Sequence, residues 1–281
     1  MTSQRVKVFE GIAHYAEYGN GSHAILCLHG NSSSSDAFAR FADGLPPAFR
    51  LICVDFPGHG QSDGADRYKG LFSFQGLATF VVELLKVLSI SPVAIVGHSM
   101  GGHVAAQLLP KLPTLQALLL ISSPPIAGAT SLPQFFRNDA PTGLIFAKTL
   151  TEDQVRELSL AFTHVNALAD TLALVESDIR RTDGAFREEL GESLSDGEVE
   201  DELAIVKSVS NVEIALLGGL KDRFIERGYY GWVAEQIGLD RQDSLVIDNV
   251  GHYPHIEAPQ MTREFFRRFL KRINISSTLS A

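Results

Sequence analysis

The 281-residue chain has only two cysteines, Cys27 and Cys53. Neither cysteine has the C-x-x-C or Cys/His spacing that is typical of a redox or zinc site. Both fall in apolar segments that read as buried strands, so we expect them to be reduced core residues. The sequence therefore does not predict a disulfide framework or a cysteine-ligated metal site.

Metal-binding histidine patterns are also absent from the sequence. Among nine histidines there is no H-E-x-x-H, and there is no His-x-His-x-Asp-His of the kind a dinuclear zinc hydrolase needs. The close pairs are His98 with His103 and His252 with His255, and two ligands fall short of the usual number. We therefore expect no metal and no other cofactor.

The chain has no excess of basic residues and no long apolar run. With 24 Lys and Arg against 33 Asp and Glu, the net charge is −9, which disfavours nucleic acid or an anionic membrane as partner. The longest apolar run, near 115–121, is too short to span a bilayer, and the N-terminus lacks the layout of a signal peptide. We expect a cytoplasmic protein with a small-molecule substrate; the sequence does not predict its oligomeric state.

Apolar segments that read as strands alternate with segments of helical spacing. This alternation predicts an α/β fold with a mostly parallel, eight-stranded sheet and helices on both faces. Residues 5–18 are expected to form an antiparallel hairpin about Gly11, and the tail 273–281 is expected to fray. The other predicted strands are 24–28, 50–54, 93–96, 115–121, 212–217 and 244–247, and the main predicted helices outside 127–205 are 36–44, 74–89, 226–237 and 259–272.

Strand signals disappear between residues 127 and 205. Helical patterns replace them at Gln134–Ala147, Thr151–His164, Leu168–Arg181 and Asp183–Leu190. We interpret 127–205 as a helical cap inserted into a core made of 1–126 and 206–281.

A nucleophile is predicted at Ser99, in the sequence Gly97-His98-Ser99-Met100-Gly101. An apolar strand precedes this sequence and a helix of small residues follows it. The glycines on either side of the serine permit a very sharp strand-to-helix turn, which lifts the serine oxygen clear of the sheet.

A serine hydroxyl needs a base to accept its proton, and the base needs a carboxylate to orient it. His252 follows the last predicted strand and is the candidate base. Asp222 follows the strand before it and is the candidate acid, with Glu226 as runner-up; a helix cap or a pair with Arg223 is the structural alternative for Asp222. Serine, acid and histidine then occur in the order that this kind of sheet gives.

The oxyanion that forms on attack requires hydrogen-bond donors. The main-chain N–H of Met100 is one candidate, and the loop His29-Gly30-Asn31 can supply the other through Asn31. Gly30 permits close approach to the substrate. The alternative is an ordinary polar turn. His59, in Pro57-Gly58-His59-Gly60, is interpreted as a scaffold residue near the site.

With these pieces placed, the chain resembles the α/β-hydrolase superfamily over nearly its whole length. More narrowly, it is similar to the metal-independent N-acyl homoserine lactone lactonases. The similarity is carried by His29 to Ser34, Ser123-Pro124-Pro125, Arg181 to Gly184, and the stretches Val246 to Asn249 and Gly251 to Pro259. It implies Ser99 as nucleophile, His252 as base, Asp222 as acid, and Asn31 with Met100 as oxyanion donors.

Two features depart from those lactonases. The acid of those lactonases is expected to be a glutamate at the position of Asp222. A lid tyrosine is also expected, but residues 141–200 of this chain contain no tyrosine, and Leu158 lies near the expected position. Apolar residues of the cap, among them Phe135, Phe136 and Phe162, could line a channel for an acyl chain or simply pack the cap.

The expected function is hydrolysis of the lactone ring of N-acyl homoserine lactones, which degrades a bacterial signal. A general carboxylesterase or a carbon–carbon bond hydrolase on the same three residues is the nearest alternative. A non-enzymatic receptor with a vestigial serine site is an alternative of another class. Dehalogenases and epoxide hydrolases of this fold carry an aspartate in place of Ser99.

Overall fold

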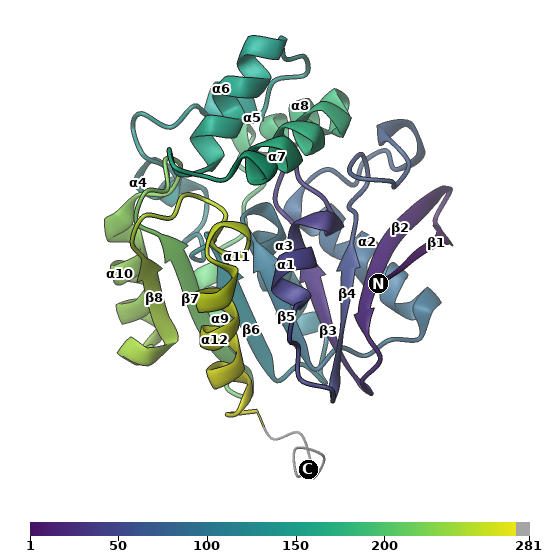
Figure 1. Ribbon diagram of the computed structural model, residues 1–281, viewed down its shortest axis with the longest axis vertical. Coiled ribbons are helices and arrows are strands. Elements are labelled where there is room, and N and C mark those ends of the chain that lie inside the picture. Colours follow the sequence, from purple (N-terminus) through teal and green to yellow (C-terminus); the bar gives the residue numbers. More distant parts are fainter. Residues whose placement is uncertain (274–281) are drawn as a thin grey trace.

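A computed structural model describes residues 1–273, and an eight-stranded sheet runs through its centre (Figure 1). The expected tail lies outside the described residues from 274 on. The strand order is β1-β2-β4-β3-β5-β6-β7-β8; β1, β2 and β4 pair antiparallel, and every other pair is parallel. The strands are β1 (Thr2–Val8), β2 (Gly11–Gly19), β3 (His23–Leu28), β4 (Phe49–Val54), β5 (Ala94–His98), β6 (Ala117–Ile121), β7 (Glu213–Gly219) and β8 (Ser244–Ile247). The predicted fold class and edge hairpin are confirmed.

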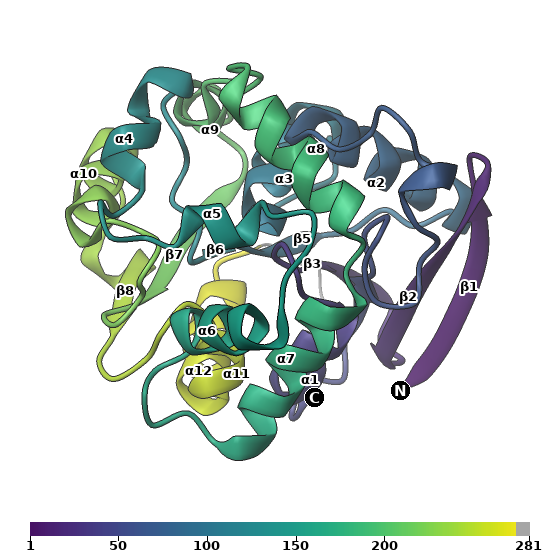
Figure 2. The ribbon, with the colours of Figure 1, turned by 90° about the horizontal axis from the view of Figure 1, so that it is seen from above.

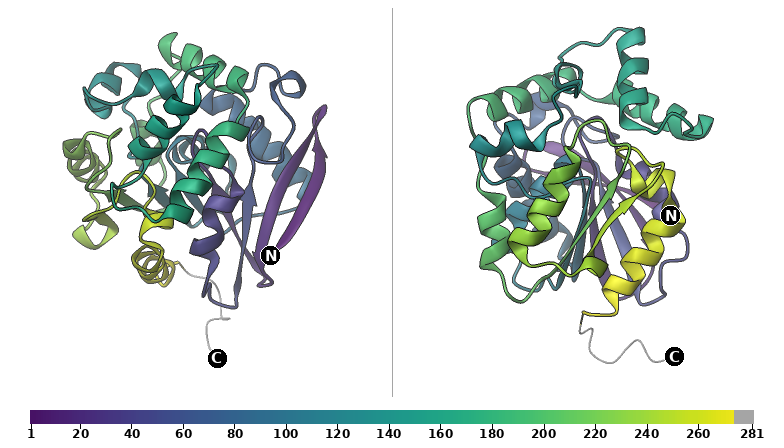
Figure 3. Two further views of the ribbon diagram at one scale, coloured as in Figure 1. Left: turned by 45° about the horizontal axis from the view of Figure 1, so that its top comes forward. Right: turned by 90° about the vertical axis from the view of Figure 1, so that its left-hand side faces the viewer.

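Helices cover both faces of the sheet because its central strands are apolar on both sides (Figure 3). Successive residues of β3 alternate between two cores: Leu26 and Leu28 pack toward α2 and α3, whereas Ile25 and Cys27 pack toward α1 and α12. Cys27 lies opposite Cys53 in the register of β3 and β4, and both are free and buried as expected. The helices outside the β6–β7 connection are α1 (Ala39–Ala42), α2 (Phe74–Leu88), α3 (Met100–Leu108), α10 (Arg227–Ile237), α11 (Pro254–Glu257) and α12 (Pro259–Leu270).

The long connection between β6 and β7 is helical, and its middle part, residues 142–195, lies over the carboxyl ends of the strands (Figure 2). Its helices are α4 (Leu132–Phe135), α5 (Thr142–Ile145), α6 (Glu152–Phe162), α7 (Ala169–Arg181), α8 (Gly184–Ser195) and α9 (Glu202–Ser208). We keep the word cap for 127–205. The predicted boundary at 205 falls inside α9, a helix missed by the sequence analysis, which packs against α3 and α10.

The predicted helix over Gln134–Ala147 is wrong, because two four-residue helices, α4 and α5, stand in its place. Pro141 disfavours the helical conformation at the residue before it and cannot donate a main-chain hydrogen bond. The chain instead runs alongside the segment after β7: Glu226 donates its N–H to the carbonyl of Phe135 at 2.8 Å, and Arg137 donates to Phe224 at 2.8 Å. These bonds replace those that a continuous helix would make.

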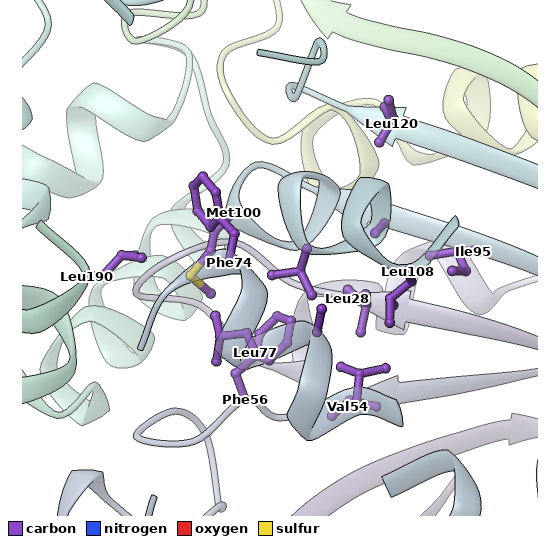
Figure 4. Close-up of a cluster of buried hydrophobic side chains, with 14 of the residues drawn as sticks. Leu28, Val54, Phe56, Phe74, Leu77, Ile95, Met100, Leu108, Leu120 and Leu190 are labelled. Atoms are coloured by element: carbon purple, nitrogen blue, oxygen red, sulfur yellow. The ribbon is translucent and has the colours of Figure 1, made fainter. Parts of the chain in front are cut away.

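A large apolar core lies between the sheet and α2 and α3, and it continues into the cap (Figure 4). Leu28 of β3 and Leu77 of α2 lie in this core. At the end of this core nearest the cap, Phe74 and Met100 lie near Leu190 of α8 (Figure 4). The cap is therefore packed directly above the start of α3.

Candidate active site

Ser99 occupies the turn between β5 and α3, in a backbone conformation that few non-glycine residues adopt. Its φ is 50° and its ψ is −124°. The turn is tight enough to require its glycines: a Cβ on Gly101 would lie 2.2 Å from the carbonyl oxygen of Leu28, and one on Gly97 would lie 2.6 Å from Gly102 Cα. The strained turn presents the Ser99 hydroxyl above the sheet, as the sequence predicts.

The three residues predicted to act together lie within hydrogen-bonding distance of one another. Ser99 Oγ is 2.8 Å from His252 Nε2, and His252 Nδ1 is 2.7 Å from Asp222 Oδ2. Because a carboxylate only accepts, Nδ1 carries the hydrogen and Nε2 of the neutral imidazole can accept the proton of Ser99. The geometry is that of a proton relay from the serine to the histidine.

Asp222 is held by its own loop after β7. Its Oδ1 accepts hydrogen bonds from the N–H groups of Phe224 (2.8 Å) and Ile225 (3.3 Å), which leaves Oδ2 for His252. Both side chains are almost fully buried. Glu226, the runner-up acid, is exposed at the start of α10.

The main chain of His252 is fixed by two hydrogen bonds. Its N–H donates to the carbonyl of Phe162, the last residue of α6, at 2.8 Å. Its carbonyl accepts from Nε2 of His98 at 2.8 Å. Burial lowers the pKa of His98 well below its usual value, so this ring is neutral.

Glu257 organises the same loop, a role that the sequence did not predict. Its carboxylate accepts from the N–H groups of Gly251 (3.1 Å) and Tyr253 (3.2 Å), on either side of His252, and from His164 (2.7 Å) in the cap. Burial raises its pKa, while these three donors oppose that shift. A pattern search could not assign this role, because it depends on main-chain donors rather than on a partner side chain.

The loop His29–Asn31 borders the turn of Ser99. A Cβ on Gly30 would lie 3.0 Å from Ser99 Cβ, so a side chain there would crowd the nucleophile. The side-chain amide of Asn31 donates to the carbonyl of Ile145 in α5 at 2.9 Å. Within residues 1–273 no hydrogen bond engages the main-chain N–H of Asn31, and the N–H of Met100 belongs to the open first turn of α3. Two main-chain donors are thus available beside Ser99.

His29 and His59 support this loop. Ser32 donates its N–H to His59 Nε2 at 3.1 Å, and Phe56 donates to His29 Nε2 at 3.0 Å. Burial lowers the pKa of both imidazoles, so they remain neutral acceptors. His59 is a scaffold residue, as the sequence analysis expects.

A cavity with about 50 Å³ of space opens onto Ser99 and His252 between the sheet and the cap. Asn31, Met100, Phe135, Phe136 and Phe162 line it, as do other apolar side chains. Gly30 is not among its lining residues in the described chain, so its part in substrate binding stays a prediction. A lining with few polar groups suits an acyl group.

The described residues hold no group of three or more His, Cys, Asp or Glu that could bind a metal ion. Among residues 1–273 no helix has the length and apolar character needed to cross a bilayer.

Comparison with known proteins gives a family and several relatives. A model of the alpha/beta hydrolase family matches residues 25–265. The uncharacterized hydrolase YugF of Bacillus subtilis (strain 168) is 25% identical in an alignment 277 positions long that covers 92% of this chain and 94% of that protein. Other curated relatives match in part: an acetyltransferase component of the acetoin cleaving system of Cupriavidus necator is 36% identical over 110 residues, 39% of this chain and 29% of that protein.

Solved structures similar to this chain include two of the N-acyl homoserine lactonase AidH. The structure complexed with N-butanoyl homoserine has a TM-score of 0.86 and 26% identity, and covers 99% of both chains. A serine-to-glycine mutant complexed with N-hexanoyl homoserine lactone has a TM-score of 0.85 and 26% identity, and covers 96% of this chain and 98% of that one. Because the family match spans most of its length, this chain belongs to the alpha/beta hydrolase family.

Proposed function

We propose that this hydrolase opens the lactone ring of N-acyl homoserine lactones. The observation that carries the proposal is the hydrogen-bonded chain of Ser99, His252 and Asp222, whose serine and histidine face an apolar cavity. The similarity to AidH over nearly all of both chains supports the substrate class. The cap 127–205 and the phenylalanines Phe135, Phe136 and Phe162 would receive the acyl chain.

In the first half of the proposed reaction, Ser99 Oγ attacks the ring carbonyl carbon while His252 Nε2 takes the serine proton. Asp222 stabilises the imidazolium that results. The oxyanion accepts hydrogen bonds from the N–H groups of Met100 and Asn31. The ring C–O bond then breaks, and His252 returns the proton to the departing oxygen, which remains tethered as the alcohol of the acyl-enzyme.

In the second half, water attacks the ester on Ser99 with His252 as the base. The bond to Ser99 Oγ breaks, the serine recovers its proton from His252, and N-acyl homoserine leaves. A variant in which His252 activates water directly would form no covalent intermediate. Rapid quench followed by mass spectrometry separates the two mechanisms, because only the first adds the mass of the substrate to Ser99.

Mass-resolved product analysis tests the proposed function. Incubation with N-hexanoyl homoserine lactone should yield a product heavier by one water, which closes again to the lactone in acid. Ser99→Ala should yield none. Release of free fatty acid would instead identify an amidase, and no turnover of any lactone would refute the proposal.

A carboxylesterase is the second candidate, and one observation favours it. Leu158, near the place of the expected lid tyrosine, is fully buried and is not among the cavity-lining residues in the described chain. That position therefore supplies no polar contact to a lactone. Rapid cleavage of p-nitrophenyl esters without lactone opening would support this alternative.

A further inference from the structure

A buried ionisable pair forms part of the cavity wall and takes no part in the relay. His103 lies one turn after Ser99 on α3, and its Nδ1 is 2.9 Å from Oε2 of Glu202 at the start of α9. The side chains of His103 and Glu202 are 6% and 1% exposed. Both therefore lie inside the protein, and His103 lines the cavity.

The carboxylate of Glu202 fixes the hydrogen of the imidazole. Glu202 Oε2 also accepts the N–H of Ile126 at 3.0 Å; with the carboxylate as the acceptor of both bonds, the hydrogen between the two side chains lies on Nδ1 of His103. With its hydrogen on Nδ1, the imidazole has Nε2 as a hydrogen-bond acceptor. Within residues 1–273 it has no hydrogen-bond partner.

The ring of His103 is held rigidly by aromatic neighbours. It stacks on Phe74 with centroids 5.0 Å apart and meets the edge of Phe135 at 5.3 Å. Apart from the relay and Asn31, His103 is the polar side chain of the described cavity lining. Burying a carboxylate is unfavourable unless its oxygens are hydrogen-bonded, and Glu202 Oε1 has no partner in the described chain. An apolar cavity wall does not require a buried histidine and carboxylate, so the pair of His103 and Glu202 calls for a function.

We propose that His103, oriented by Glu202, accepts a hydrogen bond from a donor on the acyl moiety of the substrate. This inference rests on the proposed function. One helical turn, about 5.4 Å, separates His103 from Ser99 along α3. Two donors of an N-acyl homoserine lactone lie a few bonds from the attacked carbonyl: the amide N–H and a hydroxyl on the third acyl carbon. Either would pair with Nε2.

Pairs of substrates that differ in one hydrogen-bond donor show whether the amide N–H or the 3-hydroxyl group pairs with His103. We would measure kcat/KM of the full-length protein and His103→Leu on hexanoyl, 3-hydroxyhexanoyl and 3-oxohexanoyl homoserine lactones, and on the lactone whose amide N–H is replaced by an ester oxygen. If the amide is the donor, His103→Leu should lower kcat/KM about tenfold for all three amides and leave the ester analogue unchanged. If the hydroxyl is the donor, only the 3-hydroxy substrate should lose about tenfold.

The inference is overturned if His103→Leu affects all four lactones equally, leaves all four unchanged, or selectively affects the 3-oxo substrate. Phe136→Leu is the matched control, because it alters the same cavity without removing a polar atom and should change all four lactones alike. Glu202→Gln, which keeps the size of the side chain, should reproduce the selectivity change of His103→Leu in weaker form.

Hydrolysis of p-nitrophenyl acetate, whose acyl group is too short to carry either donor, reports whether the relay is intact in each variant. If His103→Leu does not fold, His103→Asn replaces it in the same comparison. If no lactone is opened, the proposed function fails. The inference about His103 is then tested by itself, by comparing the preference for the 3-hydroxy analogue over p-nitrophenyl butyrate in the wild type and in the variant. Loss of the 3-hydroxy preference in the variant supports it, and identical ratios refute it.

Discussion

The side-chain amide of Asn31 donates a 2.9 Å hydrogen bond to the main-chain carbonyl of Ile145. This bond connects the loop beside Ser99 with helix α5 of the cap. Because the amide is directed at Ile145, we propose the main-chain N–H of Asn31, which has no partner within residues 1–273, as the oxyanion donor. The side chain of Asn31 therefore contributes to the site mainly by holding the cap in place.

Asn31→Ala tests whether the main-chain N–H of Asn31, and not its side chain, binds the oxyanion. The substitution keeps the main-chain N–H and removes the bond to the cap, so kcat should fall less than tenfold while KM rises. Removal of a side chain that itself donates to the oxyanion costs about 10²–10³ in kcat. Steady-state kinetics that show a hundredfold fall in kcat would contradict the assignment.

Substitutions of Asp222 test its orientation of His252. Asp222→Asn removes the charge and favours the wrong tautomer, so kcat should fall about 10⁴-fold. Asp222→Glu keeps the charge but must fold a longer side chain into a pair already 2.7 Å apart, so its loss should be smaller. We would measure kcat with circular dichroism as a check on folding; equal losses for both variants would show that the charge is not what matters.

The fold and the relay could be predicted from sequence because each depends on local pattern and chain order. The apolar strand before Ser99 and the glycines around it predict the turn. The placement of Asp222 and His252 after consecutive strands predicts that they meet at one edge of the sheet. Neither inference requires knowledge of side-chain contacts.

The remaining features depend on contacts between distant segments. His103 and Glu202 are 99 positions apart, and no periodicity links them. The amide of Asn31 could be aimed at the substrate or at the cap, and only the position of Ile145 decides this. The segment after Phe135 was predicted to be helical because its apolar spacing is helical, yet pairing with Phe224 and Glu226 and the presence of Pro141 override that spacing.

His255 gives a prediction for the pH dependence of stability. Its ring is fully buried beneath the His252 loop, stacks on Phe38 at 5.1 Å, and has no hydrogen-bond partner on either nitrogen within residues 1–273. Burial, with a smaller effect of His252, lowers its pKa to about 3. A histidine with a lowered pKa contributes stability that is present above its unfolded pKa of about 6.5 and is lost as the pH falls toward 3.

His255→Phe removes both the unsatisfied nitrogens and this titration. The variant should be more stable than the wild type by about 1 kcal/mol at pH 8, where His255 is neutral in both the folded and the unfolded protein. Its advantage should grow as the pH falls from 6.5 toward 3. Urea unfolding at several pH values measures both quantities, and an advantage that is constant with pH would contradict the assignment of the titration to His255.

The strained backbone of Ser99 predicts an unusual order of stability among inactive variants. Ser99→Ala and Ser99→Gly both lose the hydroxyl and its bond to His252, but alanine keeps the Cβ that disfavours a φ of 50°. Such strain costs about 1–3 kcal/mol, whereas glycine loses roughly 0.5–1 kcal/mol through the entropy of the unfolded chain. Ser99→Gly should therefore be more stable than Ser99→Ala by about 1 kcal/mol.

The same pair of substitutions at Ser159 provides the control. Ser159 lies inside α6, where glycine is about 1 kcal/mol less favourable than alanine. The order of stability should consequently reverse between the two positions when both pairs are unfolded in urea. If glycine is the less stable residue at position 99 as well, the turn does not hold the strain that lifts the nucleophile above the sheet.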